Sequence, residues 1–257
     1  MSTLLLIRHG RTTANATGVL AGRTPGVELD EKGREQAAAL GARLAELPLT
    51  AIVTSPLERT RQTADALLEA RTTAAVPAAG PAGSRAKSAR SAAAPKAVPL
   101  HVEERISECD YGHWAGRELK VLAKEQLWQV VQTHPSAVTF PGGEPMTQMS
   151  ARAVQAVRDW NEQLGAEACY AMVSHGDIIK AIVADALGMH LDMFQRIQID
   201  PCSVTVIRYT PLRPFVLRLN DTASAVGTLI PPRRKRSGGR RPGSDAQLGG
   251  GAGTAAH

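Results

Sequence analysis

The chain of 257 residues has few aromatic residues and few cysteines, and it lacks any long hydrophobic run. Its cysteines, Cys109, Cys169 and Cys202, are far apart and odd in number, so we expect reduced thiols in a cytosolic protein rather than a disulfide framework. The apolar run at residues 4–7 is too short for the core of a secretory signal, and no run approaches the roughly 20 residues of a membrane helix. The sequence therefore predicts a soluble cytoplasmic protein with no membrane partner.

Acidic residues are absent from residues 71–97, a stretch that carries a net charge of +5. Residues 231–257 carry another +5 in a cluster of arginines. Since the whole chain has a net charge of +6, the remaining residues are mildly acidic at −4, and the high pI belongs to these two stretches. A nucleic-acid partner is therefore not expected for the body of the protein. Binding of anionic partners through the arginine cluster stays open as an alternative function.

Low-complexity composition marks two parts of the chain. Residues 72–99 are rich in Ala, Pro, Ser and Gly, which predicts a disordered insertion. Residues 229–257 show no core-forming pattern and are predicted to form a disordered basic tail. The rest of residues 1–228, in a chain that is 43% hydrophobic, is enough for one α/β domain with a full core.

Short apolar runs alternate with amphipathic segments along this domain, which is the pattern of an α/β protein. Strands are expected at residues 4–7, 51–53, 100–102, 168–173, 203–209 and 214–219. Helices are expected from Asp30 to Leu44, after Ser55, and over residues 118–132, 147–164 and 177–187. Asp30 is the expected N-cap of its helix, and the segment from Ser55 to Glu58 reads as a capping box with proline at the first helical position.

Two of the predicted strands end in the same dipeptide, His-Gly. The first strand ends in Arg8-His9-Gly10, and the strand at 168–173 leads into Ser174-His175-Gly176. In open α/β sheets, ligands bind at the carboxyl ends of the strands. An imidazole there can act as a nucleophile, and Arg8 together with Arg59, in the first turn of a helix, can hold an anion. A phosphoryl group suits this set, because guanidinium forks and helix-terminal N–H groups bind it well.

Four motifs in this order resemble those of the histidine phosphatase superfamily, also called the phosphoglycerate-mutase-like family. They are Arg8-His9-Gly10 with Thr12 and Asn15, Ser55 to Ala64 around Arg59, Glu108 in Glu-Cys-Asp-Tyr-Gly, and Ser174-His175-Gly176. The resemblance covers about Thr3 to Thr222 without the low-complexity insertion, and the chain looks most similar to an actinobacterial subgroup of phosphomutases and phosphatases. It implies an α/β three-layer sandwich, with a mostly parallel central sheet flanked by helices and a small helical cap.

The resemblance also implies a role for each motif residue. His9 would take the phosphoryl group as nucleophile, and Glu108 would protonate the leaving oxygen and later accept a proton from water. The phosphate-binding residues would be Arg8, Gly10, Asn15, Arg59 and His175, with Thr12 as a further candidate. Because His9 attacks as a neutral imidazole while His175 can help as a cation, we expect their surroundings to drive the two pKa values apart. No metal and no other cofactor is expected, since the arginines supply the positive charge.

Several residues near these motifs allow alternative interpretations. The acid could also be Glu103, Glu104 or Asp110. Arg61 belongs either to the site or to the surface, and the turn at residues 141–144 either brings Glu144 toward the pocket or only starts a helix. Tyr111, Trp114 and Trp128 are most simply packing residues of the cap.

The cap bears on the choice between a phosphatase and a mutase. Bisphosphate-dependent glycolytic mutases resemble this chain in the core but carry an adjacent arginine pair in the cap, whereas Glu118 to Phe140 here contain two lysines and no arginine. The family's phosphatases often have Trp-Glu-Gly where this chain has Trp114-Ala115-Gly116, and this departure leaves the substrate contacts open. We therefore predict a phosphatase that hydrolyses a small phosphorylated metabolite through a phosphohistidine intermediate, with a phosphomutase as the alternative. The sequence leaves the identity of the phosphomonoester and the oligomeric state open.

Overall fold

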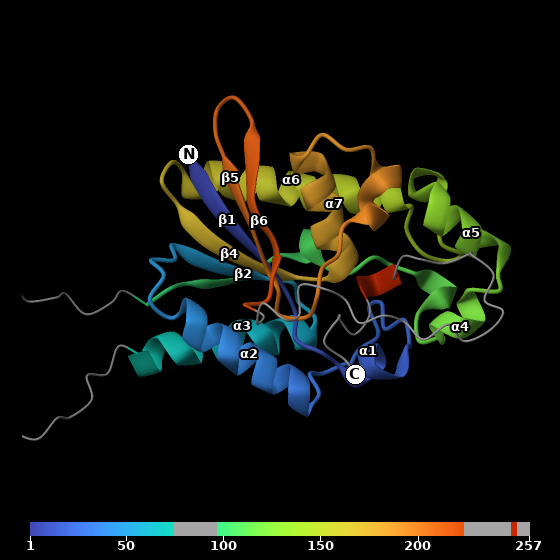
Figure 1. Cartoon of the computed structure of the whole chain (residues 1–257), viewed down its shortest axis with the longest axis horizontal. Coiled ribbons are helices and arrows are strands. Elements are labelled where there is room, and N and C mark those ends of the chain that lie inside the picture. The colour runs from blue at the N-terminus through green and yellow to red at the C-terminus, as the bar shows by residue number, and fades with distance from the viewer. Residues whose placement is uncertain (75–96, 224–247, 251–257) are drawn as a thin grey trace, which may run out of the picture.

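A six-stranded sheet forms the middle layer of the structure, a computed structural model that describes residues 1–74, 97–223 and 248–250 (Figure 1). Its strands are β1 Ser2–Arg8, β2 Ala51–Thr54, β3 Leu100–Val102, β4 Cys169–Ser174, β5 Val204–Tyr209 and β6 Pro214–Asp221. Their spatial order is β3-β2-β4-β1-β5-β6. The first four strands in this order are parallel neighbours, and β5 runs antiparallel to both β1 and β6. The prediction of a mostly parallel sheet is confirmed.

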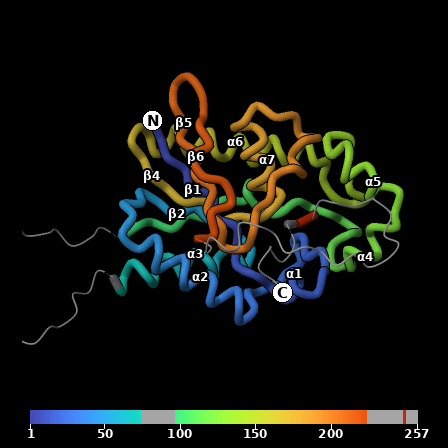
Figure 2. Tube along the Cα trace, viewed as in Figure 1, coloured from blue at the N-terminus to red at the C-terminus, as the bar shows by residue number. Residues whose placement is uncertain are grey.

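The central strand β1 is buried on both faces because its side chains are apolar almost throughout. Leu4 and Leu6 belong to one hydrophobic cluster, while Leu5 and Ile7 belong to another. Successive side chains of a strand point to opposite faces, so an uninterrupted apolar run requires cover on both sides. Figure 2 shows β1 running through the middle of the body, between β4 and β5.

Helices cover both faces of the sheet (Figure 1). On one face lie α2 Glu31–Leu44 and α3 Glu58–Ala74, and on the other lie α6 Met146–Leu164 and α7 Gly176–Ala186. The short helices are α1 Thr13–Thr17, α4 Leu119–Leu122 and α5 Gln126–Thr133. The 3-10 helices are η1 Glu104–Ile106, η2 Gly112–Trp114, η3 Pro135–Ala137, η4 Leu191–Arg196 and η6 Leu248–Gly250. Because α4 and α5 stand to one side of the layers, the predicted three-layer sandwich with a small helical cap is confirmed.

The prediction of one helix over residues 118–132 is wrong, because the segment forms two helices, α4 and α5, separated at Glu125. The backbone of Glu125 is extended, with φ −78° and ψ 148°. Its carboxylate accepts a hydrogen bond from Trp114 Nε1 at 2.9 Å and pairs with Arg117 at 2.6 Å. These contacts with residues outside the segment outweigh the local preference for one continuous helix.

The two predicted helix starts have different outcomes. Asp30 caps α2, because its side chain accepts a hydrogen bond from Gly33 N at 2.7 Å. The predicted capping box at Ser55 is wrong: α3 begins at Glu58, and Ser55 Oγ accepts a long hydrogen bond, 3.5 Å, from Leu57 N. The shorter hydrogen bond of the Ser55 hydroxyl, at 2.8 Å, is with His175, which directly follows the neighbouring strand β4.

The low-complexity regions fall largely outside the described residues, since residues 75–96, 224–247 and 251–257 are not among them. At the start of the predicted insertion, α3 continues to Ala74. Within the predicted tail, η6 (red in Figure 1) packs against the body. Its Leu248 is only 1% exposed and belongs to the same hydrophobic cluster as Leu20 and Tyr111. This part of the tail therefore contributes to the core, contrary to its composition.

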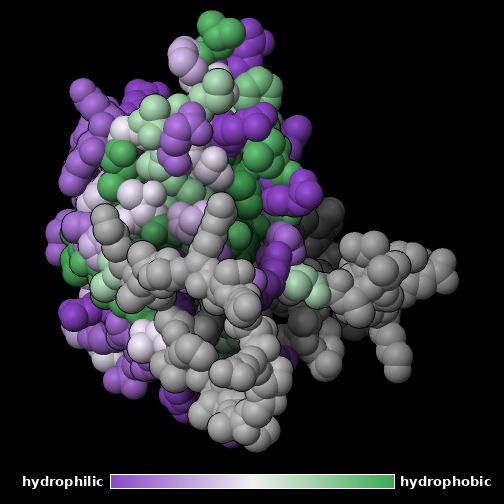
Figure 3. All heavy atoms as spheres, turned by 90° about the vertical axis from the view of Figure 1, so that its left-hand side faces the viewer, coloured by the Kyte–Doolittle hydropathy of each residue, from purple (hydrophilic) through white to green (hydrophobic). Residues whose placement is uncertain are grey.

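The β5–β6 hairpin projects from the body at the top of Figures 1 and 3. Hydrophobic side chains of the edge strand β6 remain exposed at alternate positions, Phe215, Leu217 and Leu219. Where Figure 3 leaves the surface uncovered, hydrophilic and hydrophobic residues are interspersed. None of the helices within the described ranges is long and apolar enough to cross a membrane, and the three cysteines are free thiols.

Candidate active site

The two His-Gly loops lie side by side at the carboxyl ends of β1 and β4. These strands are parallel neighbours, with Arg8 opposite Ser174. The backbone N–H of His9 continues the pairing by donating to the Ser174 carbonyl at 3.0 Å. The centroids of the His9 and His175 rings are therefore only 5.2 Å apart. The site is at the edge of the sheet where α/β proteins bind ligands.

His9 is buried in a geometry that defines its tautomer. Its Nδ1 is 2.7 Å from the carbonyl oxygen of Gly10, and because a carbonyl can only accept, Nδ1 carries the proton. The lone pair is then on Nε2, to which Arg59 Nε donates at 3.3 Å. Burial and the positive charges of Arg59 and Arg8 lower the pKa of His9 well below its usual value. His9 is therefore a neutral imidazole whose Nε2 lone pair accepts a hydrogen bond from Arg59.

Two buried guanidinium groups flank His9. Arg8 donates through Nη1 to the Ile199 carbonyl at 2.8 Å, and Arg59 donates through Nη2 to the Gly22 carbonyl at 2.7 Å. Burial lowers the pKa of Arg8 to about 10, so the side chain is still charged at neutral pH. Nη1 of Arg59 is buried and has no hydrogen-bond partner among the described residues, which makes it a donor for an anion.

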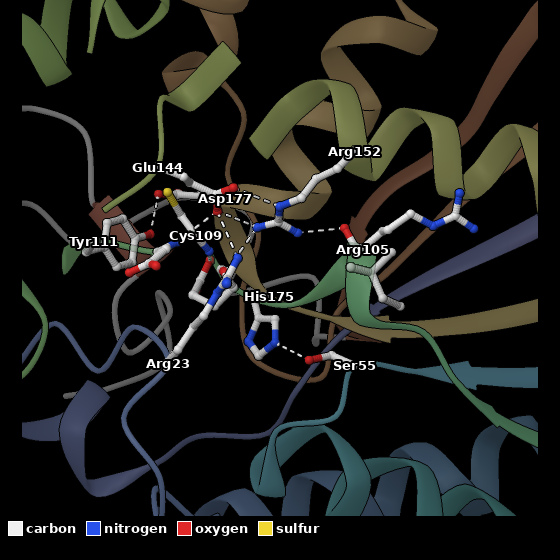
Figure 4. A network of polar contacts seen from close by, with 12 residues as sticks. Arg23, Ser55, Arg105, Cys109, Tyr111, Glu144, Arg152, His175 and Asp177 are labelled. Carbon is white, nitrogen blue, oxygen red and sulfur yellow. Dashed lines mark hydrogen bonds and ion pairs between the residues drawn. The ribbon is translucent and has the colours of Figure 1, made fainter. Parts of the chain in front are cut away.

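His175 is held differently from His9. Its Nε2 bonds the Ser55 hydroxyl at 2.8 Å, and its Nδ1 has no partner in the part of the chain that the structure describes (Figure 4). Burial and the charge of Arg59 lower the pKa of His175 well below its usual value. The two histidine pKa values, which we expect to be driven apart, are therefore not driven in opposite directions. Both move in the same direction, because the two rings share the same buried and positively charged surroundings.

Glu108 lines the same pocket as His9 and Arg59. It is 3% exposed, and its carboxylate accepts a hydrogen bond from Cys109 N at 3.0 Å. Burial, together with the negative charge of Asp177, raises the pKa of Glu108 to about 7 against the opposing charges of Arg59 and Arg8. A carboxyl group with this pKa can give and take a proton near neutral pH.

The competing residues lie elsewhere. Glu103 pairs with Arg105 and Trp160, and Asp110 accepts a hydrogen bond from Gly112 N at 3.0 Å. Glu104 and Arg61 are exposed and do not line the pocket. Among the carboxylates that the structure describes, Glu108 alone contributes to the pocket wall. No group of three or more His, Cys, Asp or Glu side chains in the described ranges is arranged to hold a metal ion.

Asp177 is a buried carboxylate that the motif reading does not single out, although it directly follows His175-Gly176. Its Oδ2 accepts a hydrogen bond from the Tyr111 hydroxyl at 2.8 Å, and its Oδ1 is 3.4 Å from the ammonium of the buried Lys180. Tyr111 is thus more than a packing residue of the cap. The negative charge of Asp177 acts on the pKa of Glu108, and its position in the first turn after a His-Gly motif is the signal that could have indicated it.

The remaining predicted phosphate-binding residues have structural partners of their own. The Gly10 N–H donates to Thr63 Oγ1 at 3.1 Å, and a side chain at Gly10 would lie 2.5 Å from the Gly33 carbonyl. The structure thus shows Gly10 packing closely against α2 rather than against the pocket. Thr12 and Asn15 line the pocket and form the capping box of α1, in which Asn15 Oδ1 accepts from Thr12. Only the Nδ2 amide of Asn15 is therefore suited to donate to an anion.

The turn η6 also reaches the site. The Gly249 carbonyl accepts a hydrogen bond from Arg8 Nη2 at 3.2 Å, and the Gly249 N–H donates to Asp177 Oδ2 at 3.2 Å. Leu248 and Gly249 line the pocket together with Glu108. A segment from the far end of the sequence therefore forms part of the pocket wall.

The site thus combines a neutral imidazole, two buried guanidinium groups and a protonatable carboxyl, and of these His9, Arg59 and Glu108 line the pocket. The model of the Histidine phosphatase superfamily (branch 1) matches residues 4–80 and 81–222, nearly all of the sheet and its helices. The chain belongs to the histidine phosphatase superfamily. This membership confirms the predicted class of activity, an enzyme that acts on phosphomonoesters through phosphohistidine, as a phosphatase or a mutase.

Curated relatives and solved structures of this superfamily match most of the chain. Phosphoserine phosphatase 1 of Hydrogenobacter thermophilus is 28% identical over 230 residues, which cover 86% of this chain and 93% of the relative. The probable phosphoglycerate mutase GpmB of Erwinia tasmaniensis is 28% identical over 207 residues, covering 80% and 84%. The structure of Bacillus stearothermophilus YhfR shares the fold with a TM-score of 0.71 at 24% identity, covering 86% and 98%. The origins of the relatives do not support the narrower prediction of an actinobacterial subgroup.

Proposed function

We propose that this histidine phosphatase superfamily member hydrolyses a small phosphomonoester, with His9 as the nucleophile and Glu108 as the proton donor. The His9 tautomer carries this proposal. With Nδ1 bonded to the Gly10 carbonyl, the nucleophilic lone pair is on Nε2, in a pocket that Arg59 and Glu108 also line. A nucleophile, a cation and a proton donor in one buried pocket are the parts that transfer of a phosphoryl group requires.

In the first step, Nε2 of His9 attacks the phosphorus atom, and the bond between phosphorus and the ester oxygen breaks. The carboxyl group of Glu108 gives its proton to the leaving oxygen, so the product alcohol departs neutral. The charge on the phosphoryl oxygens is stabilised by Arg8, Arg59 and His175. Charge-assisted hydrogen bonds of this kind contribute about 1.5–3 kcal/mol each.

In the second step, a water molecule attacks phosphorus and the bond to His9 Nε2 breaks. The Glu108 carboxylate takes the proton of the water, which returns Glu108 to its protonated form and releases inorganic phosphate. The pKa of about 7 lets Glu108 serve in both steps near neutral pH. Approach of a dianionic phosphate favours the protonated form of His175, since the negative charge opposes the effect of Arg59.

Hydrolysis is proposed rather than mutase activity because of the cap. A mutase has to hold a second anionic group of its substrate, and no arginine occurs between Glu118 and Phe140. Of the two lysines in this stretch, Lys120 of α4 pairs with Glu118 at 2.6 Å on the exposed surface. The names of the two curated relatives place phosphoserine and phosphoglycerate first among the substrates to examine.

A panel of phosphorylated metabolites, assayed for phosphate release with the wild type and His9→Ala, tests this proposal. We expect the wild type to release phosphate from at least one class and the variant to release none above background. Unchanged hydrolysis by His9→Ala would contradict the mechanism. Interconversion of 3- and 2-phosphoglycerate in the presence of bisphosphoglycerate, faster than hydrolysis, would favour the mutase.

Narrower assignments accompany this proposal. The first is a cytoplasmic location, which accords with the three free cysteines. The second is a catalytic domain over residues 1–228. The third is the actinobacterial subgroup, for which the relatives supply no support. Fractionation of the cells that produce the protein tests the first, and truncation after residue 228 tests the second. Activity that survived the truncation would show that Leu248–Gly250 is not needed for the chemistry.

A further inference from the structure

Glu108 lies in an irregular segment between η1 and η2, so no helix or strand holds its carboxyl group in place. The hydrogen bond that its carboxylate accepts comes from Cys109, the adjacent residue, which moves with it. The position of the carboxyl group in the pocket therefore depends on what holds the main chain at Glu108.

Two guanidinium groups hold this main chain. The Glu108 carbonyl oxygen accepts a hydrogen bond from Arg23 Nε at 2.8 Å and another from Arg152 Nη2 at 3.1 Å. Arg23 belongs to the loop after β1 and α1, and Arg152 belongs to α6. Arg152 also donates to the Arg105 carbonyl at 2.6 Å, so it contacts the segment at a second point upstream of Glu108.

One carboxylate joins the two arginines. Glu144 accepts hydrogen bonds from Arg152 at 2.6 and 2.9 Å and from Arg23 at 3.0 Å (Figure 4). It also accepts from the amide of Asp110 at 2.9 Å. The side chains of Glu144 and Arg152 are 10% and 16% exposed, so this pairing is shielded from solvent on most sides. Burial opposes ionisation of Glu144, but the hydrogen bonds from Arg152 and the Asp110 amide, together with the charges of Arg152 and Arg23, outweigh it, and the pKa of Glu144 lies below its usual value.

The turn that carries Glu144 is packed directly on the Glu108 segment. A side chain at Gly143 would lie 2.2 Å from the Asp110 carbonyl, and one at Gly112 would lie 2.3 Å from the Pro141 carbonyl. The two stretches are therefore in backbone contact, and the Glu144 N–H donates to the Asp110 carbonyl at 2.9 Å. Displacement of the turn would displace the segment that follows Glu108.

We propose that Arg23, Glu144 and Arg152 are positioning residues, which hold Glu108 where it can protonate the leaving oxygen. The inference rests on the proposed function of Glu108. None of the three side chains lines the pocket, and their hydrogen bonds lead to the Glu108 main chain, directly from Arg23 and Arg152 and through these two arginines from Glu144. The sequence leaves open whether the turn brings Glu144 toward the pocket or only starts a helix. In this proposal Glu144 supports Glu108 and does not line the pocket.

The dependence of kcat/KM on the leaving group of the substrate distinguishes positioning of Glu108 from a general contribution to the folded structure. The substrates are p-nitrophenyl phosphate and p-nitrobenzyl phosphate, which differ by one methylene but release an acidic phenol and a weakly acidic alcohol. Only the alcohol needs a proton from Glu108 to leave. The measured quantity is kcat/KM, which reports the steps up to loss of the leaving group.

The variants are Arg152→Gln and Glu144→Gln, with Arg23→Gln as a milder change because the Arg23 side chain is 39% exposed. We expect kcat/KM for the benzyl ester to fall about tenfold or more beyond any fall for the phenyl ester, within the effect of about 10² to 10⁴ that general acids supply. We also expect Arg152→Lys to recover part of the loss. Arg158→Gln is the matched control, since Arg158 is on the same helix and pairs at the surface with Asp185 at 3.4 Å. Its ratio of the two rates should equal that of the wild type.

Equal losses on both substrates, or no change on either, in folded variants with a wild-type circular dichroism spectrum would overturn the positioning role. An insoluble Arg152→Gln would leave Arg23→Gln to decide the question. Failure of the proposed function looks different, because the wild type would then hydrolyse neither ester, or His9→Ala would hydrolyse both.

Discussion

At the end of β1, His9 is bonded through Nδ1 to a carbonyl of its own loop, whereas at the end of β4, His175 is bonded through Nε2 to the hydroxyl of Ser55. The carbonyl can only accept, so it holds His9 in one tautomer with a permanent lone pair on Nε2. The hydroxyl can donate or accept, so it allows His175 to change its protonation state. Two motifs that read alike in sequence are thereby suited to different tasks, nucleophilic attack and binding of a changing charge.

The largest expected effect is that of His9→Ala, which removes the fixed lone pair. Turnover should fall by at least about 10⁴-fold, because no other group can form the covalent intermediate. Rapid quench into alkaline detergent, which preserves the acid-labile phosphohistidine, after mixing with a ³²P-labelled substrate should show labelled protein for the wild type and none for the variant. Label on the variant at the wild-type level would mean that another residue is the nucleophile.

His175→Ala should have the second largest effect. Removal of one group that stabilises the phosphoryl oxygens is expected to lower kcat/KM by about 10²- to 10³-fold. In the same quench experiment the variant should still become labelled, although slowly, because His9 is intact. If the label were lost as completely as in His9→Ala, the assignment of the two histidines would not hold.

The next prediction concerns the pH dependence of kcat/KM and Asp177, the residue that follows the second His-Gly motif. Glu108 must be protonated to act on the substrate, so kcat/KM should decline above pH about 7, where the group loses its proton. Asp177→Asn removes a negative charge that raises the pKa of Glu108, so the decline should begin at lower pH. Rate profiles between pH 5 and 9, at constant ionic strength, measure this shift, and an unmoved profile would separate Asp177 from Glu108.

Ser55→Ala should have the smallest effect, a few-fold loss in kcat/KM. The hydroxyl orients His175 but contacts neither His9 nor Glu108 in the structure, and a neutral hydrogen bond contributes roughly 0.5–1.5 kcal/mol. Ser55→Thr, which keeps a hydroxyl, is the control. An effect as large as that of His175→Ala would show that Ser55 does more than orient the ring.

The sequence predicts those parts of the fold and site whose signals are local. The strand at Leu4–Ile7 and the His-Gly motif that follows it are contiguous, and the N-cap at Asp30 needs only residues of its own turn. Ser55 satisfies the local pattern of a cap but does not form the capping box, because its shorter hydrogen bond is with His175, 120 residues away. The helix break at Glu125 has the same origin, since Trp114 and Arg117 lie outside the segment.

The support around Glu108 could not be predicted for a similar reason. Arg23, Glu144 and Arg152 come from a loop, a turn and a helix, and no spacing in the sequence relates them. The effect of burial on the two histidines was likewise beyond the sequence, because it requires knowing that both rings share one enclosed site. Motifs indicate the candidate catalytic residues, whereas tertiary contacts determine their protonation and position.

The place of β1 in the sheet has a consequence for how the protein folds. β1 is made first but pairs with β4 and β5, which end at Ser174 and Tyr209. The ribosome must therefore deliver most of the domain before His9 gains its neighbours, and the contacts that complete the site have a high sequence separation, which slows their formation. Catalysis is accordingly among the last properties that the chain acquires during folding, and recovery of activity after denaturation reports closure of the sheet around β1.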